Sequence, residues 1–245
     1  MNEFHCNLAL PSISLVHVWV VFLPDVRTRL DRLHTVLSPE EKERAARFVF
    51  ERDRQRFVFA RGILRVLLGR YLDREPGRIA FQYGAHGKPA LAGEETTPSD
   101  LRFNVSHSGD YCLCAVALRR DVGIDIEMVR SDVECLPLAE RFFTRREYED
   151  LLWGSERDRR ARFFRYWTCK EAYLKARGIG ISSGLAQIEV TFNADGSIEC
   201  GSRDDPMIRG SDCLVRPISI GDHVAAAVAA EGDDWDMVVC DYPAN

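Results

Sequence analysis

Two hydrophobic periodicities follow one another twice along this chain, and this alternation restricts the folds it can adopt. Apolar residues recur every three or four positions from Phe57 to Tyr71, which predicts a helix, and every second position from Leu101 to Val105, which predicts a strand. The second half has a strand pattern at 122–127 and then a helical pattern of about 20 residues, from near 158 to 176. We therefore predict an α+β fold of two similar halves, each with a mostly antiparallel sheet packed by helices.

The two predicted halves meet at a short charged turn, residues 119–121. The sequence thus divides into an N-terminal α+β half, residues 1–119, and a C-terminal α+β half, residues 120–245. Each half contains a capping box that marks the start of a helix, at 38–41 in the first and at 144–147 in the second. No internal sequence repeat is visible between them.

Charge and composition exclude several classes of function. The net charge of −5 argues against nucleic-acid binding over the whole surface. The apolar run at 14–23 is too short to span a bilayer, so we predict a buried strand there and no membrane partner. The eight cysteines show no paired metal-ligand spacing, and Cys112 and Cys114 should share one face of a strand. Free thiols in a chain of this size indicate a reducing compartment, and we expect the cytoplasm.

The strand at 122–127, with the sequence VGIDIE, carries the first candidate for chemistry. Successive side chains of a strand point to opposite faces, so Asp125 and Glu127 share one face, about 7 Å apart along the strand. Two carboxylates so placed can converge on one hard cation with oxygen-rich coordination. We expect Gly123 to keep that face open to a ligand. The alternative is a solvated strand edge with two ordinary acids.

The predicted helix near 158–176 carries the second candidate, in the segment WTCKEAYLK. Trp167, Glu171 and Lys175 recur at four-residue spacing and therefore lie along one helix face. The alternative is a favourable surface pair of Glu171 with Lys175, although Trp167 on the same face indicates a partly covered cleft.

Two further segments suit phosphate binding. FNVSHSG at 103–109 brings hydroxyl, imidazole and backbone donors together through Ser106 and His107. Lys88, between Gly87 and Pro89, stands in a stiff turn where it can act as a point charge on a phosphate. Polar turns and solvated lysines are the alternatives. Together, the cation site, the carboxylate–lysine helix and these segments indicate phosphoryl-type transfer, in which positioning and charge neutralisation dominate.

These motifs resemble those of the 4′-phosphopantetheinyl transferases of the surfactin-synthetase-activating type. The resemblance rests on FNVSHS at 103–108, VGIDIE at 122–127 and WTCKEAYLK at 167–175, in the family's order and spacing, and extends from about residue 37 to 192. It implies a pseudo-dimeric α+β fold with coenzyme A bound between the halves, near residues 119–121. The sequence leaves the oligomeric state open, and such an internal duplication makes a monomer the simpler expectation. It further implies a holo-acyl-carrier-protein synthase activity: the 4′-phosphopantetheine group passes from coenzyme A to a serine of an apo acyl or peptidyl carrier protein, and 3′,5′-ADP leaves.

The resemblance also implies roles for individual residues. Asp125, Glu127 and Glu171 would hold Mg²⁺, with Mn²⁺ as the alternative ion. Glu171 is the expected base for the carrier serine and Lys175 the expected partner of the leaving phosphate, although the sequence leaves open which carboxylate takes the proton. The family's phosphate-binding positions correspond to the residues Lys88, Ser106 and His107.

One position departs from the family pattern. Some relatives have a lysine, for the 3′-phosphate of coenzyme A, where this chain has Glu41. Lys42, Arg44 or Arg56 would have to take its place, and we name Arg44 and Arg56 as candidate coenzyme ligands.

The segment between Arg141 and Arg165 is a candidate docking surface for the carrier. It contains eight arginines and five acids in an otherwise acidic protein, and carrier proteins are typically acidic. Phe142 and Phe143 could add apolar contacts, with core burial as the alternative. The sequence does not choose among carriers of fatty-acid, polyketide, nonribosomal-peptide or lysine biosynthesis.

Two other functions compete with this one. A catalytically inactive binding module for coenzyme A or a carrier is disfavoured by the intact acids and Lys175. A different metal-dependent phosphotransferase is disfavoured because the chain has no G-x-x-x-x-G-K-[ST] loop and no kinase signature.

Overall fold

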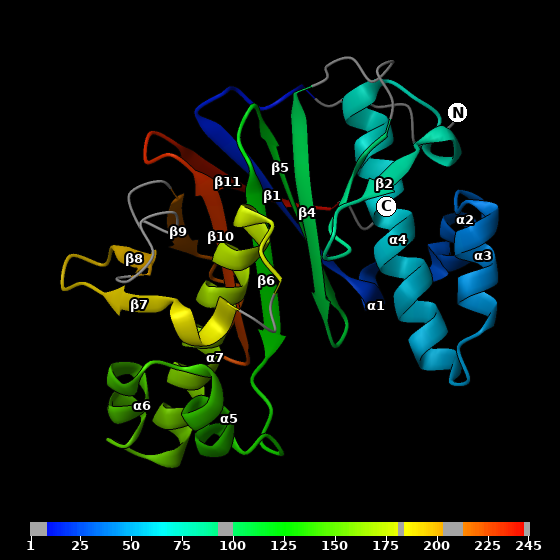
Figure 1. Cartoon of the computed structure of the whole chain (residues 1–245). Coiled ribbons are helices and arrows are strands. Elements are labelled where there is room, and N and C mark those ends of the chain that lie inside the picture. The colour runs from blue at the N-terminus through cyan, green and yellow to red at the C-terminus, as the bar shows by residue number, and fades with distance from the viewer. Residues whose placement is uncertain (1–8, 93–99, 181–183, 203–212, 243–245) are drawn as a thin grey trace.

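Two sheets lie face to face in the middle of the molecule, and helices cover the outer face of each (Figure 1). The structure is a computed structural model that describes residues 9–92, 100–180, 184–202 and 213–242. Its helices and mostly antiparallel strands confirm the predicted α+β fold. In the described part of the chain, no helix is long and apolar enough to cross a membrane.

The first sheet has the strand order β11-β1-β5-β4. Its strands are, in this order, Asp236–Asp241, Leu15–Phe22, Tyr111–Leu118 and Leu101–Ser108. The pairs β1–β5 and β4–β5 are antiparallel, whereas β1 and β11 run parallel. A small antiparallel hairpin, β2 (Phe81–Tyr83) with β3 (Pro89–Leu91), lies beside this sheet (Figure 1).

The second sheet has the order β6-β10-β9-β8-β7 and is antiparallel throughout. Its strands are Val122–Met128, Val224–Glu231, Cys213–Pro217, Ile198–Gly201 and Glu189–Phe192. Of these strands, β6 is the one predicted above, at 122–127.

Each half is built around one helix of 22 residues, α4 (Glu51–Leu72) or α7 (Glu156–Arg177). The shorter helices are α1 (Leu23–Val26), α2 (Leu30–Thr35), α3 (Pro39–Ala46), α5 (Cys135–Phe142) and α6 (Arg145–Leu151), with 3-10 turns η1 (Arg27–Arg29), η2 (Pro76–Arg78) and η3 (Leu185–Gln187). Both predicted capping boxes are confirmed, at the starts of α3 and α6. Helix α7 ends at Gly178, which adopts the left-handed conformation.

Three apolar clusters fill the layers. The first packs α4 against the outer face of the first sheet and contains both Cys112 and Cys114, as predicted. The second packs α7, α5 and α6 against the outer face of the second sheet. The third lies between the sheets, where Val122, Ile124 and Ile126 of β6 enter the core as their alternation predicts.

A buried glutamate–cation pair recurs in the two halves. Glu41 of the α3 capping box bonds Arg65 of α4 at 2.5 Å, and Glu147 of the α6 capping box bonds Lys170 of α7 at 2.6 Å. Arg65 and Lys170 lie equally far from the first residues of their helices. Each cation also donates to two carbonyls around the 3-10 turn that follows, those of Pro76 and Ile79 and those of Leu185 and Ile188. This shared framework is the structural likeness between halves that no sequence repeat revealed.

The last strand crosses from one half to the other. β11 belongs by sequence to the C-terminal half, yet it pairs with β1 of the first sheet from Leu15↔Asp236 to Val20↔Asp241. Sheet membership therefore does not follow the proposed division at 119/120 throughout, and that division stays a prediction.

Candidate active site

Side chains, rather than a backbone ladder, join the two sheets where β4 runs beside β6. Alternate residues of β4 reach across: the side chain of Asn104 accepts from the N–H of Ile124, at 2.9 Å. Ser106 Oγ donates to Asp125 Oδ1 at 2.9 Å and Ser108 Oγ to Glu127 Oε2 at 2.8 Å. The candidate carboxylates are thus held by hydroxyl groups of the other half.

Helix α7 crosses β6 in direct contact at Gly123. A Cβ atom at this position would lie 2.1 Å from the Ala172 carbonyl oxygen and 2.3 Å from the Ala176 nitrogen. The expectation that Gly123 keeps the strand face open to a ligand is therefore wrong. Glycine is needed because the helix covers this face, and the close approach brings the polar side of α7 to Asp125.

Asp125, Glu171 and Lys175 form one buried cluster. Lys175 Nζ lies 2.5 Å from Asp125 Oδ1 and 3.3 Å from Glu171 Oε2. The Asp125 side chain is 2% exposed and that of Glu171 is 10% exposed, so both carboxylates are largely removed from water. The predicted stripe on α7 therefore does not form a surface ion pair, because β6 and β4 cover it.

The pKa values of this cluster reflect the burial of its acids first and the charges of their neighbours second. Burial, and then the charge of Asp125, raise the pKa of Glu171 to about 7. Burial also raises the pKa of Asp125, although Lys175 opposes this shift. Burial disfavours the charged form of Lys175, but the charges of Asp125 and Glu171 outweigh it and raise its pKa.

Glu127 lies beside the cluster, bound to Ser108. Burial and the charge of Asp125 raise the pKa of Glu127. Trp167, the third member of the predicted stripe, instead packs among the aromatic rings of Phe142, Phe143 and Phe163.

The acidic cluster fits a hard cation in its chemistry. The Asp125 Oδ2 atom is buried and has no hydrogen-bond partner, which is the state of a carboxylate oxygen that awaits a further ligand. The donor set of Asp125, Glu127 and Glu171 consists of carboxylate oxygens, as Mg²⁺ prefers. In the described residues, however, no three acidic, histidine or cysteine side chains converge on one point. Lys175 lies between Asp125 and Glu171 and supplies the positive charge.

The predicted phosphate-binding residues separate into different places. Ser106 joins the cluster, with Lys175 Nζ 3.3 Å from its hydroxyl oxygen. His107 points to the opposite side of β4, where partial desolvation and then the charges of Lys175 and Arg56 lower its pKa. Lys88 donates to backbone carbonyls at the end of α7 and the start of β6.

A cavity of about 880 Å³ opens at the junction of the halves. One wall is the β2–β3 hairpin with its turn, and the opposite wall is the end of α7. The lining includes Lys88, Arg102, Phe103, Asp121 and Arg177. Because Asp121 precedes β6 and Ala176 follows Lys175, this cavity borders the segments that carry the cluster.

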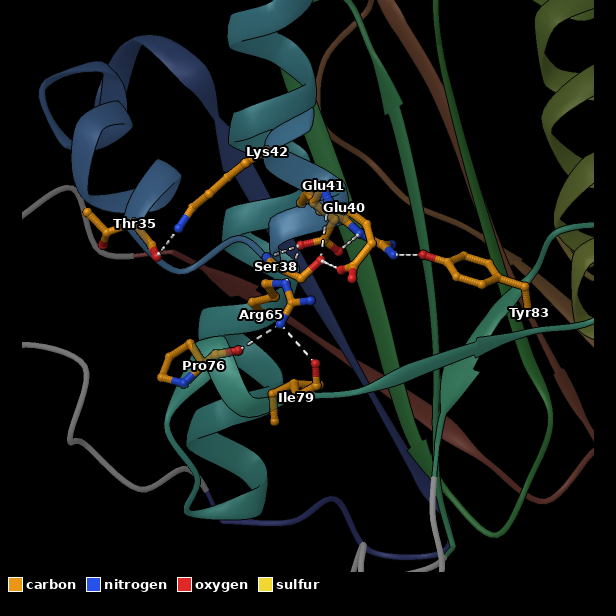
Figure 2. Close-up of polar contacts among 10 residues, drawn as sticks. Thr35, Ser38, Glu40, Glu41, Lys42, Arg65, Pro76, Ile79 and Tyr83 are labelled. Atoms are coloured by element: carbon orange, nitrogen blue, oxygen red, sulfur yellow. Dashed lines mark hydrogen bonds and ion pairs between the residues drawn. The ribbon is translucent and has the colours of Figure 1, made fainter. Parts of the chain in front are cut away.

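A second cavity, of about 680 Å³, lies over the first half. Its lining combines three aromatic rings with four guanidinium groups, those of Arg44, Arg61, Arg65 and Arg78. Tyr83 lines both cavities, so they adjoin. In Figure 2, Glu41 lies within a network with Ser38 and Arg65, and the ring of Tyr83 lies beside it.

The departure at Glu41 has a structural explanation. Its carboxylate is buried, caps α3 and accepts from Arg61 and Arg65, at 2.5 Å each. Hydrogen bonds from these two guanidinium groups outweigh burial and lower the pKa of Glu41. Arg61 also contacts the Tyr83 hydroxyl. Glu41 therefore belongs to the framework, and the cavity lining combines the four guanidinium groups with the carboxylates of Glu40 and Glu41.

The three candidate substitutes for that position differ in orientation. Lys42 donates to the Thr35 carbonyl at 3.2 Å and points away from Tyr83 (Figure 2). Arg56 pairs with Asp110 at the β4–β5 turn, at 3.0 Å. Arg44 lines the second cavity and lies over the Phe57 ring, 5.2 Å from its centroid.

Several side chains of the arginine-rich segment, between Arg141 and Arg165, are already engaged in contacts within the protein. Arg145, Arg146 and Arg160 each contact an acid, at 2.8 Å, 3.4 Å and 2.5 Å. Phe143 is buried in the second core, and Phe142 packs against it partly. The alternative of core burial is therefore confirmed for Phe143. The exposed apolar side chains nearby are Leu152 and Trp153, which the sequence analysis did not select.

Comparisons with known proteins match both halves of the chain. Residues 25–119 match the family model described as 4′-phosphopantetheinyl transferase, N-terminal, and residues 121–228 match that of the 4′-phosphopantetheinyl transferase superfamily. The 4′-phosphopantetheinyl transferase HetI of Nostoc sp. (strain PCC 7120) is 47% identical over 186 residues, covering 76% of this chain and 77% of that protein. The chain belongs to the 4′-phosphopantetheinyl transferase superfamily. This confirms the resemblance and the prediction of a transferase.

One further relative and one solved structure are also similar to this transferase. The 4′-phosphopantetheinyl transferase Sfp of Bacillus subtilis (strain 168) is 28% identical over 214 residues, or 86% of this chain and 91% of its own. The crystal structure of a holo-(acyl-carrier-protein) synthase from Bacillus anthracis str. Ames, in complex with CoA (3′,5′-ADP), is 24% identical, with a TM-score of 0.38. The match covers 46% of this chain and 96% of the synthase chain.

Sequence reasoning missed several residues that hold the transferase site together. Asn104 and Ser108 alternate with Ser106 in the motif FNVSHS, so period-two alternation could have selected all three. Arg61 and Asp110 gave no such signal, because each acquires its partner only through tertiary contact.

Proposed function

We propose that this transferase moves the 4′-phosphopantetheine group from coenzyme A to a serine of an apo acyl or peptidyl carrier protein. The observation that carries the proposal is the buried Asp125–Lys175–Glu171 cluster, beside a cavity at the junction of the halves. Family membership supports the reaction, and the cluster supports the assignment of residues.

The proposed step is a displacement at the β-phosphorus of coenzyme A. The carrier serine oxygen forms a new bond to phosphorus, the bond from phosphorus to the bridging oxygen breaks, and 3′,5′-ADP departs. The serine proton passes to Glu171, whose raised pKa of about 7 suits a general base near neutral pH. Lys175, which contacts both Asp125 and Glu171, neutralises charge on the leaving phosphate.

The donor set suits Mg²⁺, with Mn²⁺ as the alternative ion. Asp125, Glu127 and Glu171 would hold the cation, and the unpartnered Asp125 Oδ2 supports this assignment. Bound there, the ion supplies charge neutralisation and polarises the phosphate. Ser106 and Ser108 orient Asp125 and Glu127 by hydrogen bonds from the other half.

The two adjoining cavities offer a path for coenzyme A. The 880 Å³ cavity borders the cluster, and the aromatic, arginine-lined cavity beyond Tyr83 suits the phosphorylated adenosine end. We assign Arg44 to the 3′-phosphate, because it lines this cavity while Arg56 is paired with Asp110. His107 and Arg56, on the other face of β4, are secondary candidates for the same end.

The carrier surface, the compartment and the oligomeric state complete the proposal. Arg159 and Arg160, on the side of α7 that lines a groove with 131–137, are the proposed contacts for an acidic carrier. The cytoplasm is proposed because the seven cysteines in the described part of the chain are free thiols, while Cys6 lies outside the described residues. A monomer is proposed because the likeness of the two halves gives the chain an internal pair.

Intact-mass spectrometry tests the function directly. An apo carrier protein incubated with this enzyme, coenzyme A and Mg²⁺ should gain the mass of one phosphopantetheine group, and chelation of the metal should abolish the gain. Asp125→Ala should abolish it as well. If apo carriers of the fatty-acid, polyketide and peptide types all stay unmodified, the proposed function is refuted. Activity in the Asp125 variant would remove the metal assignment but leave the reaction.

A further inference from the structure

Lys88 stands in the turn of the β2–β3 hairpin, yet its ammonium group binds the other half of the molecule. Nζ donates to the carbonyl of Lys175 at 2.6 Å and to that of Val122 at 3.0 Å, and it lies 3.5 Å from the carbonyl of Ala176. An ammonium group has three N–H donors. Backbone carbonyls therefore occupy two of them at normal hydrogen-bond distance, and a third carbonyl lies at the outer limit.

The position of two of these carbonyls at the end of α7 favours binding of a cation. The last carbonyl groups of an α-helix have no partner within the helix, and they form the negative end of its dipole. Helix α7 ends at Arg177, so the carbonyls of Lys175 and Ala176 lie in its last turn, where the Gly178 N–H donates to the Lys175 carbonyl at 3.3 Å. Lys88 binds them from outside and at the same time binds the carbonyl of the first residue of β6, which ties the end of the helix to the start of the strand.

The backbone groups that Lys88 binds lie close along the chain to the Lys175–Asp125 contact. Lys175 offers its carbonyl to Lys88 and its ammonium to Asp125, the latter at 2.5 Å. Val122 begins the strand that carries Asp125, and Gly123 sets how closely α7 approaches that strand. Thus Lys88 fixes the backbone on both sides of the Lys175–Asp125 pair without touching either side chain's charged group.

We propose that Lys88 is a positioning residue, which acts by holding the last turn of α7 against β6 so that Lys175 meets Asp125. The proposal rests on the proposed function of that pair, and it differs from the phosphate-ligand role that the family resemblance implies. The hairpin turn is built to hold the lysine: Gly84 donates to the Lys88 carbonyl at 3.0 Å, and Gly87 has φ +78°. The same hairpin walls the 880 Å³ cavity, so a coenzyme bound there would lie beside these contacts of Lys88.

Two variants of Lys88 and one control separate the roles. Lys88→Met removes all three donors, and Lys88→Arg keeps donors for the carbonyls. Arg216→Met is the control, because Arg216 of β9 also donates to a distant backbone carbonyl, that of Trp235 at 2.8 Å, and has no described contact with α7. The measurements are kcat with an apo carrier, the Kd of coenzyme A by calorimetry, thermal stability, and hydrogen exchange of residues 172–178.

We expect Lys88→Met to change kcat much more than it changes the Kd of coenzyme A. Lys88→Met should lower kcat by about 10- to 100-fold, since misplacement by about 1 Å costs that much, while the Kd of coenzyme A changes less than about threefold. Exchange at 172–178 should become faster. Lys88→Arg should restore most of kcat, and Arg216→Met should lower stability without changing kcat.

The opposite split would overturn the proposal. A Kd of coenzyme A raised tenfold or more, with kcat at saturation unchanged, would make Lys88 a phosphate ligand. Unchanged exchange at 172–178 in Lys88→Met would also refute the tie, and this readout needs no activity. If the wild-type enzyme modifies no apo carrier, the proposed function fails, and hydrogen exchange still decides whether Lys88 holds the helix. If Lys88→Met does not fold, Lys88→Arg decides the question through hydrogen exchange at residues 172–178. Exchange as slow as in the wild type sustains the proposal, and faster exchange refutes it.

Discussion

Replacing Glu171 with glutamine is expected to stabilise the metal-free protein while abolishing transfer. The wild-type carboxylate is buried near Asp125 and Glu127, and Lys175 is the single cation bonded to it among the described contacts. Glutamine keeps the shape of the side chain and removes its charge. The variant therefore separates the cost of holding a buried carboxylate from the activity that this carboxylate serves.

The magnitude follows from the pKa of Glu171, which rises from 4.5 to about 7 on folding. An acid whose folded pKa is raised destabilises the fold as pH rises between the two values, because the unfolded chain releases the proton first. At about 1.4 kcal/mol per pKa unit, the neutral variant gains about 3 kcal/mol at pH 8 and about 1 kcal/mol at pH 5. For a chain of this size, 3 kcal/mol corresponds to a rise in Tm of about 6–12 °C.

The assay is thermal unfolding by circular dichroism in the presence of a chelator, at pH 8 and at pH 5. Glu156→Gln is the matched control, because Glu156 stands on the same helix with its side chain 74% exposed. Its Tm should stay within a degree or two of the wild type at both pH values. Added Mg²⁺ should stabilise the wild type by mass action and Glu171→Gln much less. The reasoning is refuted if Glu171→Gln gains no stability at pH 8, or gains the same amount at pH 5.

Three other substitutions test separate parts of the structure. Lys170→Met should destabilise the fold by about 3–5 kcal/mol, since it leaves Glu147 buried without its cation, and the double variant with Glu147→Gln should recover much of this in denaturant titrations. Gly123→Ala should displace α7 and reduce transfer at least tenfold, because its Cβ would lie 2.1 Å from a helix carbonyl; a wild-type rate would disprove the contact. Arg44→Gln should raise the KM for coenzyme A about tenfold or more, because a charged hydrogen bond is lost. The KM for 3′-dephospho-coenzyme A should stay unchanged. Equal effects on the KM of both donors would exclude Arg44 as a ligand of the 3′-phosphate.

Local sequence pattern predicted the parts of the site that depend on one element at a time. The period of two places Asp125 and Glu127 on one face of β6, and the period of four places Glu171 and Lys175 on one face of α7. Family motifs then predicted that these faces meet. The fold class followed in the same way, from alternating helical and strand periods.

The rest depends on contacts that no local pattern encodes. A glycine on a charged strand face has the same sequence signal whether it admits a ligand or a helix, and only the packing of α7 on Gly123 decides between them. Lys88 is in a turn by sequence, but its partners are carbonyls far away along the chain. The sequence likewise does not predict the pairing of β1 with β11, because the period-two alternation of each strand is compatible with any neighbouring strand.

The position of β11 affects how the chain can be made. A ribosome delivers the first sheet's strands β1, β4 and β5 well before β11, and until then β1 is an edge strand with unpaired backbone groups. The first half therefore cannot complete its sheet during synthesis of its own residues, and an expressed fragment ending at residue 119 would have the same open edge. Supplying residues 236–241 as a peptide should close that edge, so a split form of this enzyme is better cut elsewhere or complemented in trans.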